Sequence, residues 1–136
     1  MLKKLIFILL AAVVLVSCQS KSVTAEPVTV TGGSYKNVAP NELNAMLKNK
    51  DFVFVNVHIP FAGNIADTDL SIPYDQIEQN LSLLPVDKNA KIVLYCRSGR
   101  MSAIAAEELV SLGYTNIWNL DGGMVEWEQA GYDIEK

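Results

Sequence analysis

Basic residues are scarce in this sequence, and metal-binding side chains are scarcer still. The 136 residues include 11 lysines and arginines against 15 aspartates and glutamates, which gives a formal net charge of -4. This balance excludes the basic surface that is typical of a nucleic-acid-binding domain. With one histidine and two cysteines, the chain also lacks a set of side chains that could hold a metal ion. We therefore expect no metal and no nucleic-acid partner.

The glycine spacing of a dinucleotide site is missing too. Gly122 and Gly123 are adjacent, but no Gly-x-Gly-x-x-Gly pattern accompanies them, so we expect no cofactor of that kind. Half of the residues are hydrophobic, which suits a packed core. The length of the chain allows one small domain and not two.

The apolar run at the start of the chain is too short to cross a bilayer comfortably as a helix. It covers residues 5–16, after Lys3 and Lys4. A basic start, a short apolar region and a small-residue exit are typical of a secretory signal. The exit, Leu-Val-Ser-Cys at residues 15–18, resembles the lipobox of bacterial lipoproteins, which implies cleavage before Cys18 and acylation of that cysteine. The alternative is an ordinary signal peptide, or an uncleaved anchor with an incidental cysteine.

On the lipoprotein interpretation, residues 1–17 are the signal peptide and the protein is exported and lipid-anchored at the cell envelope. Gln19 follows the cysteine, and the absence of aspartate there predicts the periplasmic side of the outer membrane if the host has two membranes. Residues 18–34 are rich in serine, threonine, valine and glycine and keep no strand or helix period. They predict a flexible tether, which leaves residues 35–136 as the folded domain.

Strand and helix patterns alternate along this domain. Three short apolar runs, rich in β-branched and aromatic residues, are typical of buried strands: residues 52–57, 91–95 and 117–120. Four segments have apolar residues at helical spacing: residues 40–48, 74–84, 98–112 and 124–130. The alternation predicts an α/β fold with a mostly parallel sheet that is covered by helices on both faces.

Cys96 stands between the second of these strands and the helix that follows. If Cys18 carries lipid, Cys96 has no partner for an internal disulfide, so it is either an inert core residue or a reactive thiol. In parallel sheets the working site lies beyond the carboxyl ends of the strands, and Cys96 falls at such an end. This position favours the reactive thiol.

The segment Cys-Arg-Ser-Gly-Arg-Met-Ser at residues 96–102 predicts a strand-to-helix turn that binds anions. Successive backbone N–H groups and the positive end of a helix would face the thiol and favour the nucleophilic thiolate. Arg97 and Arg100 bring positive charge, and the hydroxyls of Ser98 and Ser102 could cap the helix or bind an oxyanion.

At this point the sequence resembles the single-domain rhodaneses. Residues 95–102 resemble their active-site loop, and Leu-Asp-Gly-Gly-Met at residues 120–124, followed by Trp127 and Gly131, resembles their closing motif. The resemblance implies a five-stranded parallel sheet flanked by helices. It also implies a sulfurtransferase in which Cys96 takes sulfane sulfur from thiosulfate, a polysulfide or a persulfide and passes it to a thiol acceptor. The donor would be bound by the loop residues Arg97, Ser98, Gly99, Arg100, Met101 and Ser102.

The sequence also departs from the family pattern in three places. Asn56-Val57-His58 stands where many members have Asp-x-Arg, and Gly63-Asn64-Ile65 stands where Gly-His-Ile is common. Met101 replaces the common arginine five positions after the cysteine. These changes bear on substrate preference more than on sulfur chemistry. His58 is an accessory candidate, as a base or a partner of the thiolate, with a structural role as the alternative.

Two other functions share this loop. A sulfur carrier or binding module, without turnover, would have the same residues. A phosphatase or arsenate reductase would need an arginine six positions after the cysteine, where this chain has Ser102. The sequence therefore favours sulfur transfer or sulfur carriage.

Overall fold

The computed structural model describes residues 22–136, so the predicted signal peptide and Cys18 lie outside the described residues. Six strands form one sheet in the order β1-β2-β6-β5-β3-β4. Their bounds are Ala25–Val30 (β1), Gly33–Val38 (β2), Val53–Asn56 (β3), Leu70–Ser71 (β4), Ile92–Tyr95 (β5) and Ile117–Leu120 (β6). The helices are Pro40–Leu47 (α1), Arg100–Ser111 (α2), Gly123–Gln129 (α3) and the 3-10 helix Glu78–Leu83 (η1).

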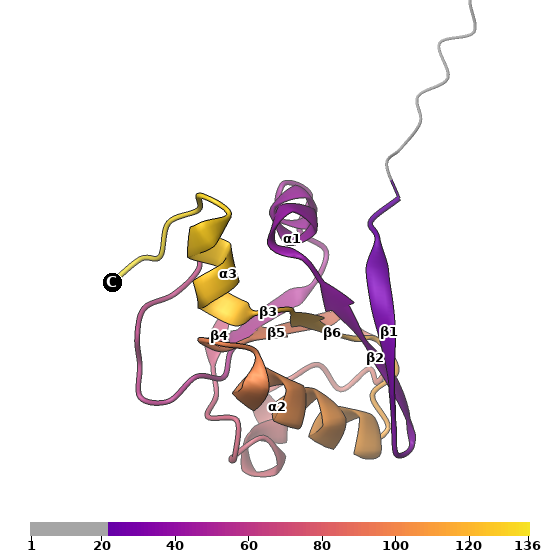
Figure 1. Ribbon diagram of the computed structural model, residues 1–136. Helices are drawn as coiled ribbons and strands as arrows, with labels where there is room; N and C mark the ends of the chain where they lie inside the picture. The colour runs from indigo at the N-terminus through magenta and orange to yellow at the C-terminus, as the bar shows by residue number, and fades with distance from the viewer. Residues whose placement is uncertain (1–21) are drawn as a thin grey trace, which may run out of the picture.

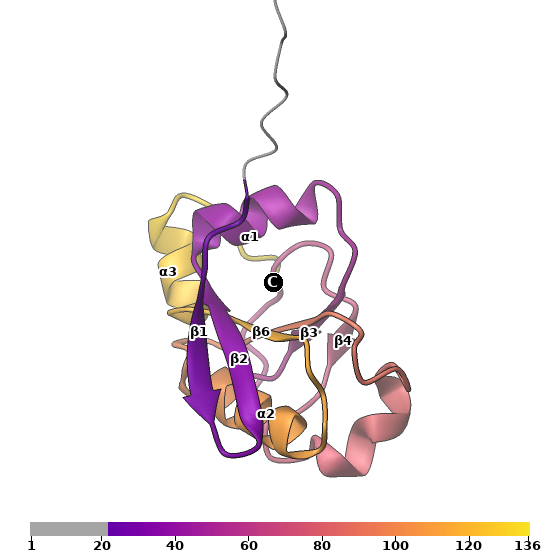
Figure 2. The same cartoon turned by 90° about the vertical axis from the view of Figure 1, so that its right-hand side faces the viewer.

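Five of the strands, β2, β6, β5, β3 and β4, run parallel, as predicted. Helix α2 covers one face of the sheet, and α1 and α3 cover the other (Figures 1 and 2). All four residues of β5 are buried, because the strand has a packed layer on each side. Ile92 and Leu94 belong to the core under α2, while Val93 and Tyr95 belong to the core under α1 and α3. The predicted α/β fold is therefore confirmed.

The first strand corrects the prediction of a tether that extends to residue 34. Strand β1 pairs antiparallel with β2 over its whole length, from Ala25 opposite Val38 to Val30 opposite Gly33. Val28 and Val30 pack against the core under α2, which explains why this weakly patterned segment is ordered. The sheet thus has a sixth strand at its edge.

The predicted helix at residues 74–84 is shorter than expected. Only Glu78–Leu83 is helical, as a 3-10 segment with a kink at Asn80. Leu84 is extended because it precedes Pro85, and the ring of a proline disfavours helical geometry in the residue before it. In the described part of the chain, no helix combines the length and the apolar character needed to span a membrane.

Candidate active site

The loop that carries Cys96 links the end of β5 to the start of α2. Gly99 precedes the first helical residue, Arg100, and has a φ of 98°, a left-handed conformation that favours glycine. The turn is therefore tight, and it bends the chain around the cysteine. Only 1% of the Cys96 surface is exposed, so the sulfur lies inside the loop and not on its rim.

Two donors converge on the Cys96 sulfur. The backbone N–H of Gly99 lies 3.0 Å from Sγ, and the hydroxyl of Ser102 lies 3.3 Å from it. Ser102 is fully buried, and its Oγ also lies 3.2 Å from the carbonyl oxygen of Gly99, so its single proton is shared between two acceptors. Both groups can hydrogen-bond to a thiolate, which is the nucleophilic form of cysteine. Two fixed donors therefore lie within hydrogen-bonding distance of the sulfur.

The start of α3 holds the other side of the loop. The N–H of Met124 donates to the carbonyl oxygen of Cys96 at 2.9 Å, and the N–H of Val125 donates to that of Arg97 at 3.0 Å. Gly123 allows this close approach, because a Cβ at its position would lie only 2.4 Å from the Cys96 carbonyl oxygen. The two carbonyls are therefore bound by α3, while the Gly99 N–H faces the sulfur. This contact joins the two segments that resemble the motifs of the single-domain rhodaneses.

The remaining loop residues lie around the rim. Arg97, Ser98 and Arg100 are exposed, and within residues 22–136 their side chains form no hydrogen bond or salt bridge. Met101 is half-buried and packs against the core that includes Cys96. Ser98 does not cap α2, since Gly99 takes that position. Of the two predicted serines, only Ser102 reaches the sulfur.

His58 lies at the same sheet edge as the cysteine loop. The N–H of Val57 donates to the carbonyl of Tyr95, so the chains after β3 and β5 run side by side. The imidazole Nδ1 of His58 is buried and has no partner in the described residues. Burial, and secondarily the charge of Arg97, lowers the pKa of His58, which favours the neutral ring. No hydrogen bond in the described part of the chain joins it to Cys96.

A polar network that the sequence did not reveal fixes the loop after β3. Asn56 Nδ2 donates to the carbonyl of Gly63 and to Oδ1 of Asn64, both at 2.9 Å. The Tyr95 hydroxyl accepts the N–H of Ile65 at 3.0 Å, and burial above all raises the pKa of this phenol. Asn56 and Asn64 are both departures from the family pattern, and they contact each other. The sequence shows both departures from the family pattern, but it does not show that the two side chains contact each other.

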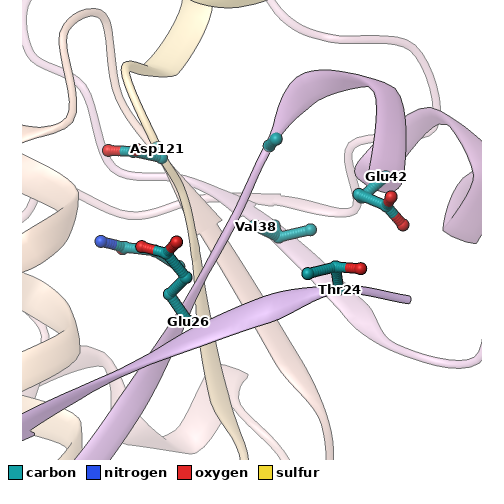
Figure 3. Close-up of a pocket in the computed structure, with 7 residues that line it drawn as sticks. Thr24, Glu26, Val38, Glu42 and Asp121 are labelled. Atoms are coloured by element: carbon teal, nitrogen blue, oxygen red, sulfur yellow. The ribbon is translucent and has the colours of Figure 1, made fainter. Parts of the chain in front are cut away.

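A separate hollow of about 250 Å³ lies where the β1–β2 hairpin meets the end of β6 (Figure 3). Glu26, Glu42 and Asp121 are among its lining residues. None of the lining residues belongs to residues 96–102, so the hollow does not include the Cys96 sulfur. Three acidic side chains thus gather where the hairpin meets the end of β6.

The sheet, the cysteine loop and its contact with α3 define a rhodanese-like domain. The sequence matches the Rhodanese-like domain family over residues 39–130, and the chain belongs to this family. A tRNA uridine(34) hydroxylase of Erwinia tasmaniensis is 34% identical over 101 residues, which are 70% of this chain and 28% of the relative. An uncharacterized protein of Synechocystis is 33% identical over 101 residues, 73% of this chain and 55% of its own. The chain therefore spans about a quarter to a half of the length of these curated relatives.

Solved structures give the same fold. A rhodanese-like domain protein of Staphylococcus aureus has a TM-score of 0.60 and 30% identity, with 74% of this chain and 98% of that chain covered. A thiosulfate sulfurtransferase of Pseudomonas aeruginosa has a TM-score of 0.64 at 22% identity, with 74% of this chain and 20% of that chain covered, a likeness of fold alone.

Proposed function

We propose that this protein is a sulfurtransferase that carries sulfane sulfur as a persulfide on Cys96. The observation that supports it is the convergence of the Gly99 N–H and the Ser102 hydroxyl on Sγ. A sulfurtransferase needs a sulfur that is a nucleophile in one step and a leaving group in the next, and both roles place negative charge on Sγ. Fixed donors at that atom serve both steps.

In the first step, the Cys96 thiolate attacks the outer sulfur of thiosulfate. A new S–S bond forms at Sγ, the old S–S bond breaks, and sulfite leaves with its electron pair. In the second step, an acceptor attacks the outer sulfur of the persulfide, and the electron pair of the broken bond returns to Sγ. Polysulfides and organic persulfides can replace thiosulfate as donors in the same scheme. Arg97 and Arg100, exposed at the rim, would attract such anions.

The contacts of Ser102 argue against a phosphatase or arsenate reductase. This residue stands where those enzymes need an arginine, and its side chain is fully buried against Sγ. A short hydroxyl at this site cannot give the bidentate contact that a guanidinium makes with an oxyanion.

The test is thiocyanate formation from thiosulfate and cyanide by the full chain in mild detergent. We expect turnover in the wild type and none in Cys96→Ser, while Cys18→Ser, the matched change at the only other cysteine, keeps it. Activity that survives in Cys96→Ser would refute the mechanism. A persulfide that forms on Cys96 but discharges only to another protein would identify a carrier instead of an enzyme.

The proposal includes export and a lipid anchor on Cys18. Its support is the sequence of residues 15–18 after a short apolar run. Metabolic labelling with a fatty acid analogue should mark the wild type and not Cys18→Ser, and equal labelling of both would refute the anchor.

A further inference from the structure

The loop after β3 is held in place, yet it exposes a large aromatic side chain. The carbonyl of Gly63 accepts the Asn56 amide at 2.9 Å, and Asn64 and Glu135 exchange two backbone hydrogen bonds of 2.8 Å. Phe61 nonetheless keeps 64% of its surface exposed. Because the backbone beside it is fixed, this exposure belongs to the folded loop and does not result from fraying.

Phe61 borders a hollow of about 390 Å³ beside the cysteine loop. The residues that line it are Phe61, Ala62, Gly63, Arg97 and Lys136. A smaller hollow of about 200 Å³ shares Ala62, Arg97 and Lys136 with it and adds Met124, Glu128 and Ile134. We call the two together the Phe61–Arg97 groove. Arg97, which directly follows Cys96 in the chain, lines both hollows.

Arg97 and Lys136 bring positive charge to this groove, and Glu128 lies among the residues of the smaller hollow. Arg97 is exposed and takes part in no salt bridge within residues 22–136. On the hairpin side, the hollow of Figure 3 carries Glu26, Glu42 and Asp121. An anion in the groove is attracted by the exposed guanidinium of Arg97.

We propose that the Phe61–Arg97 groove binds the sulfur acceptor, and that this acceptor is a small thiol that carries a carboxylate. Arg97 would bind the carboxylate through charge-assisted hydrogen bonds, and Phe61 would cover the aliphatic part of the molecule. A hollow of a few hundred Å³ has the size of a small-molecule site. The inference rests on the proposed sulfur transfer and adds the class of the acceptor.

The transfer balances without another reactant. The acceptor thiolate attacks the outer sulfur of the Cys96 persulfide, and a new S–S bond forms between acceptor and sulfur. The bond from that sulfur to Sγ breaks, and its electron pair stays on Sγ as the thiolate. The products are the acceptor persulfide and the free Cys96 thiolate, where the Gly99 N–H and the Ser102 hydroxyl receive the charge.

The test compares two acceptors that differ only in charge. The full chain is loaded with sulfur from thiosulfate, and loss of the sulfur is followed by intact mass with 3-mercaptopropionate or its neutral amide at equal thiolate concentration. We expect the carboxylate to react about two- to fivefold faster, the size expected of an exposed ion pair. Arg97→Gln should remove this preference, and Phe61→Ala should slow both thiols. Val86→Ala, which truncates an apolar side chain with 95% exposure outside the groove, should change neither rate.

Each other outcome refutes the inference. Equal rates for the two thiols, unchanged in Arg97→Gln and Phe61→Ala, would refute the groove while discharge to cyanide still supports sulfur transfer. Discharge to an acidic protein thiol and to no small thiol would replace the proposed acceptor by a macromolecule. A chain that takes up no sulfur from any donor would refute the proposed function, and the acceptor site with it.

Discussion

Replacing Gly123 by alanine would separate the cysteine loop from α3. Gly123 has a φ of 58°, and an added Cβ would lie 2.4 Å from the Cys96 carbonyl oxygen and 2.8 Å from that of Arg97. The left-handed backbone costs an alanine about 1–2 kcal/mol. The overlap is with backbone atoms that cannot rotate away, which adds about 1–3 kcal/mol. We therefore expect Gly123→Ala to lower the free energy of unfolding by about 2–5 kcal/mol.

Gly113→Ala is the matched control. Gly113 has a φ of 92°, and a Cβ there would meet nothing within 4 Å, so only the backbone cost of about 1–2 kcal/mol applies. The difference between the two variants in free energy of unfolding, measured in urea, isolates the steric contribution at Gly123. Sulfur transfer by Gly123→Ala should fall about ten- to hundredfold, the size of a lost hydrogen bond to a charged group at Sγ, while Gly113→Ala keeps its rate. If the two variants had equal stability and equal activity, the contact between loop and α3 would have no role in positioning the sulfur.

Three further predictions concern single side chains. Ser102→Ala should slow sulfur transfer about ten- to hundredfold by removing a donor from Sγ, whereas Ser111→Ala on the exposed end of α2 should not, and equal rates would refute the role of the hydroxyl. Because the pKa of His58 is lowered in the folded protein, the unfolded chain binds a proton first as the pH falls below about 6.5. Stability should therefore decrease as the pH falls through about 6.5, and thermal unfolding of His58→Gln should show a weaker pH dependence; identical slopes would contradict this. Tyr95→Phe should lower the free energy of unfolding in urea by about 1–3 kcal/mol, because it leaves buried hydrogen-bond partners unsatisfied. Tyr132→Phe, which removes an exposed hydrogen bond, should have almost no effect.

The parallel sheet could be predicted because each of its central strands has a strong local signal in the sequence. Residues 92–95 and 117–120 are short, mainly apolar runs, which are typical of strands buried on both faces. Strand β1 has no comparable signal. Its valines alternate with threonine and proline, and it is ordered by its pairing with β2, a contact that local periodicity does not contain.

The candidate site also has features that the sequence predicts and features that it does not. The position of Cys96 after a strand and before a helix followed from the chain order alone. The contact of Ser102 with Sγ depends on the left-handed turn at Gly99, and the pairing of Asn56 with Asn64 depends on how the loop after β3 folds back. A carboxylate at position 56 could not donate the two hydrogen bonds that the Asn56 amide donates. These relations connect residues through space, and a single sequence does not encode them in its spacing.

The β1–β2 hairpin has a consequence for where the chemistry takes place. Ala25 starts β1 opposite Val38, at the carboxyl end of β2, which is the sheet edge where the Cys96 loop lies. If Cys18 carries the lipid that the sequence predicts, six residues separate it from this strand, and their full contour length is about 20 Å. The reactive edge would then stay within the layer of water next to the lipid head groups. The protein would exchange sulfur with the molecules enriched in that layer. The short segment between the lipid and β1 would thus limit which molecules reach the active site.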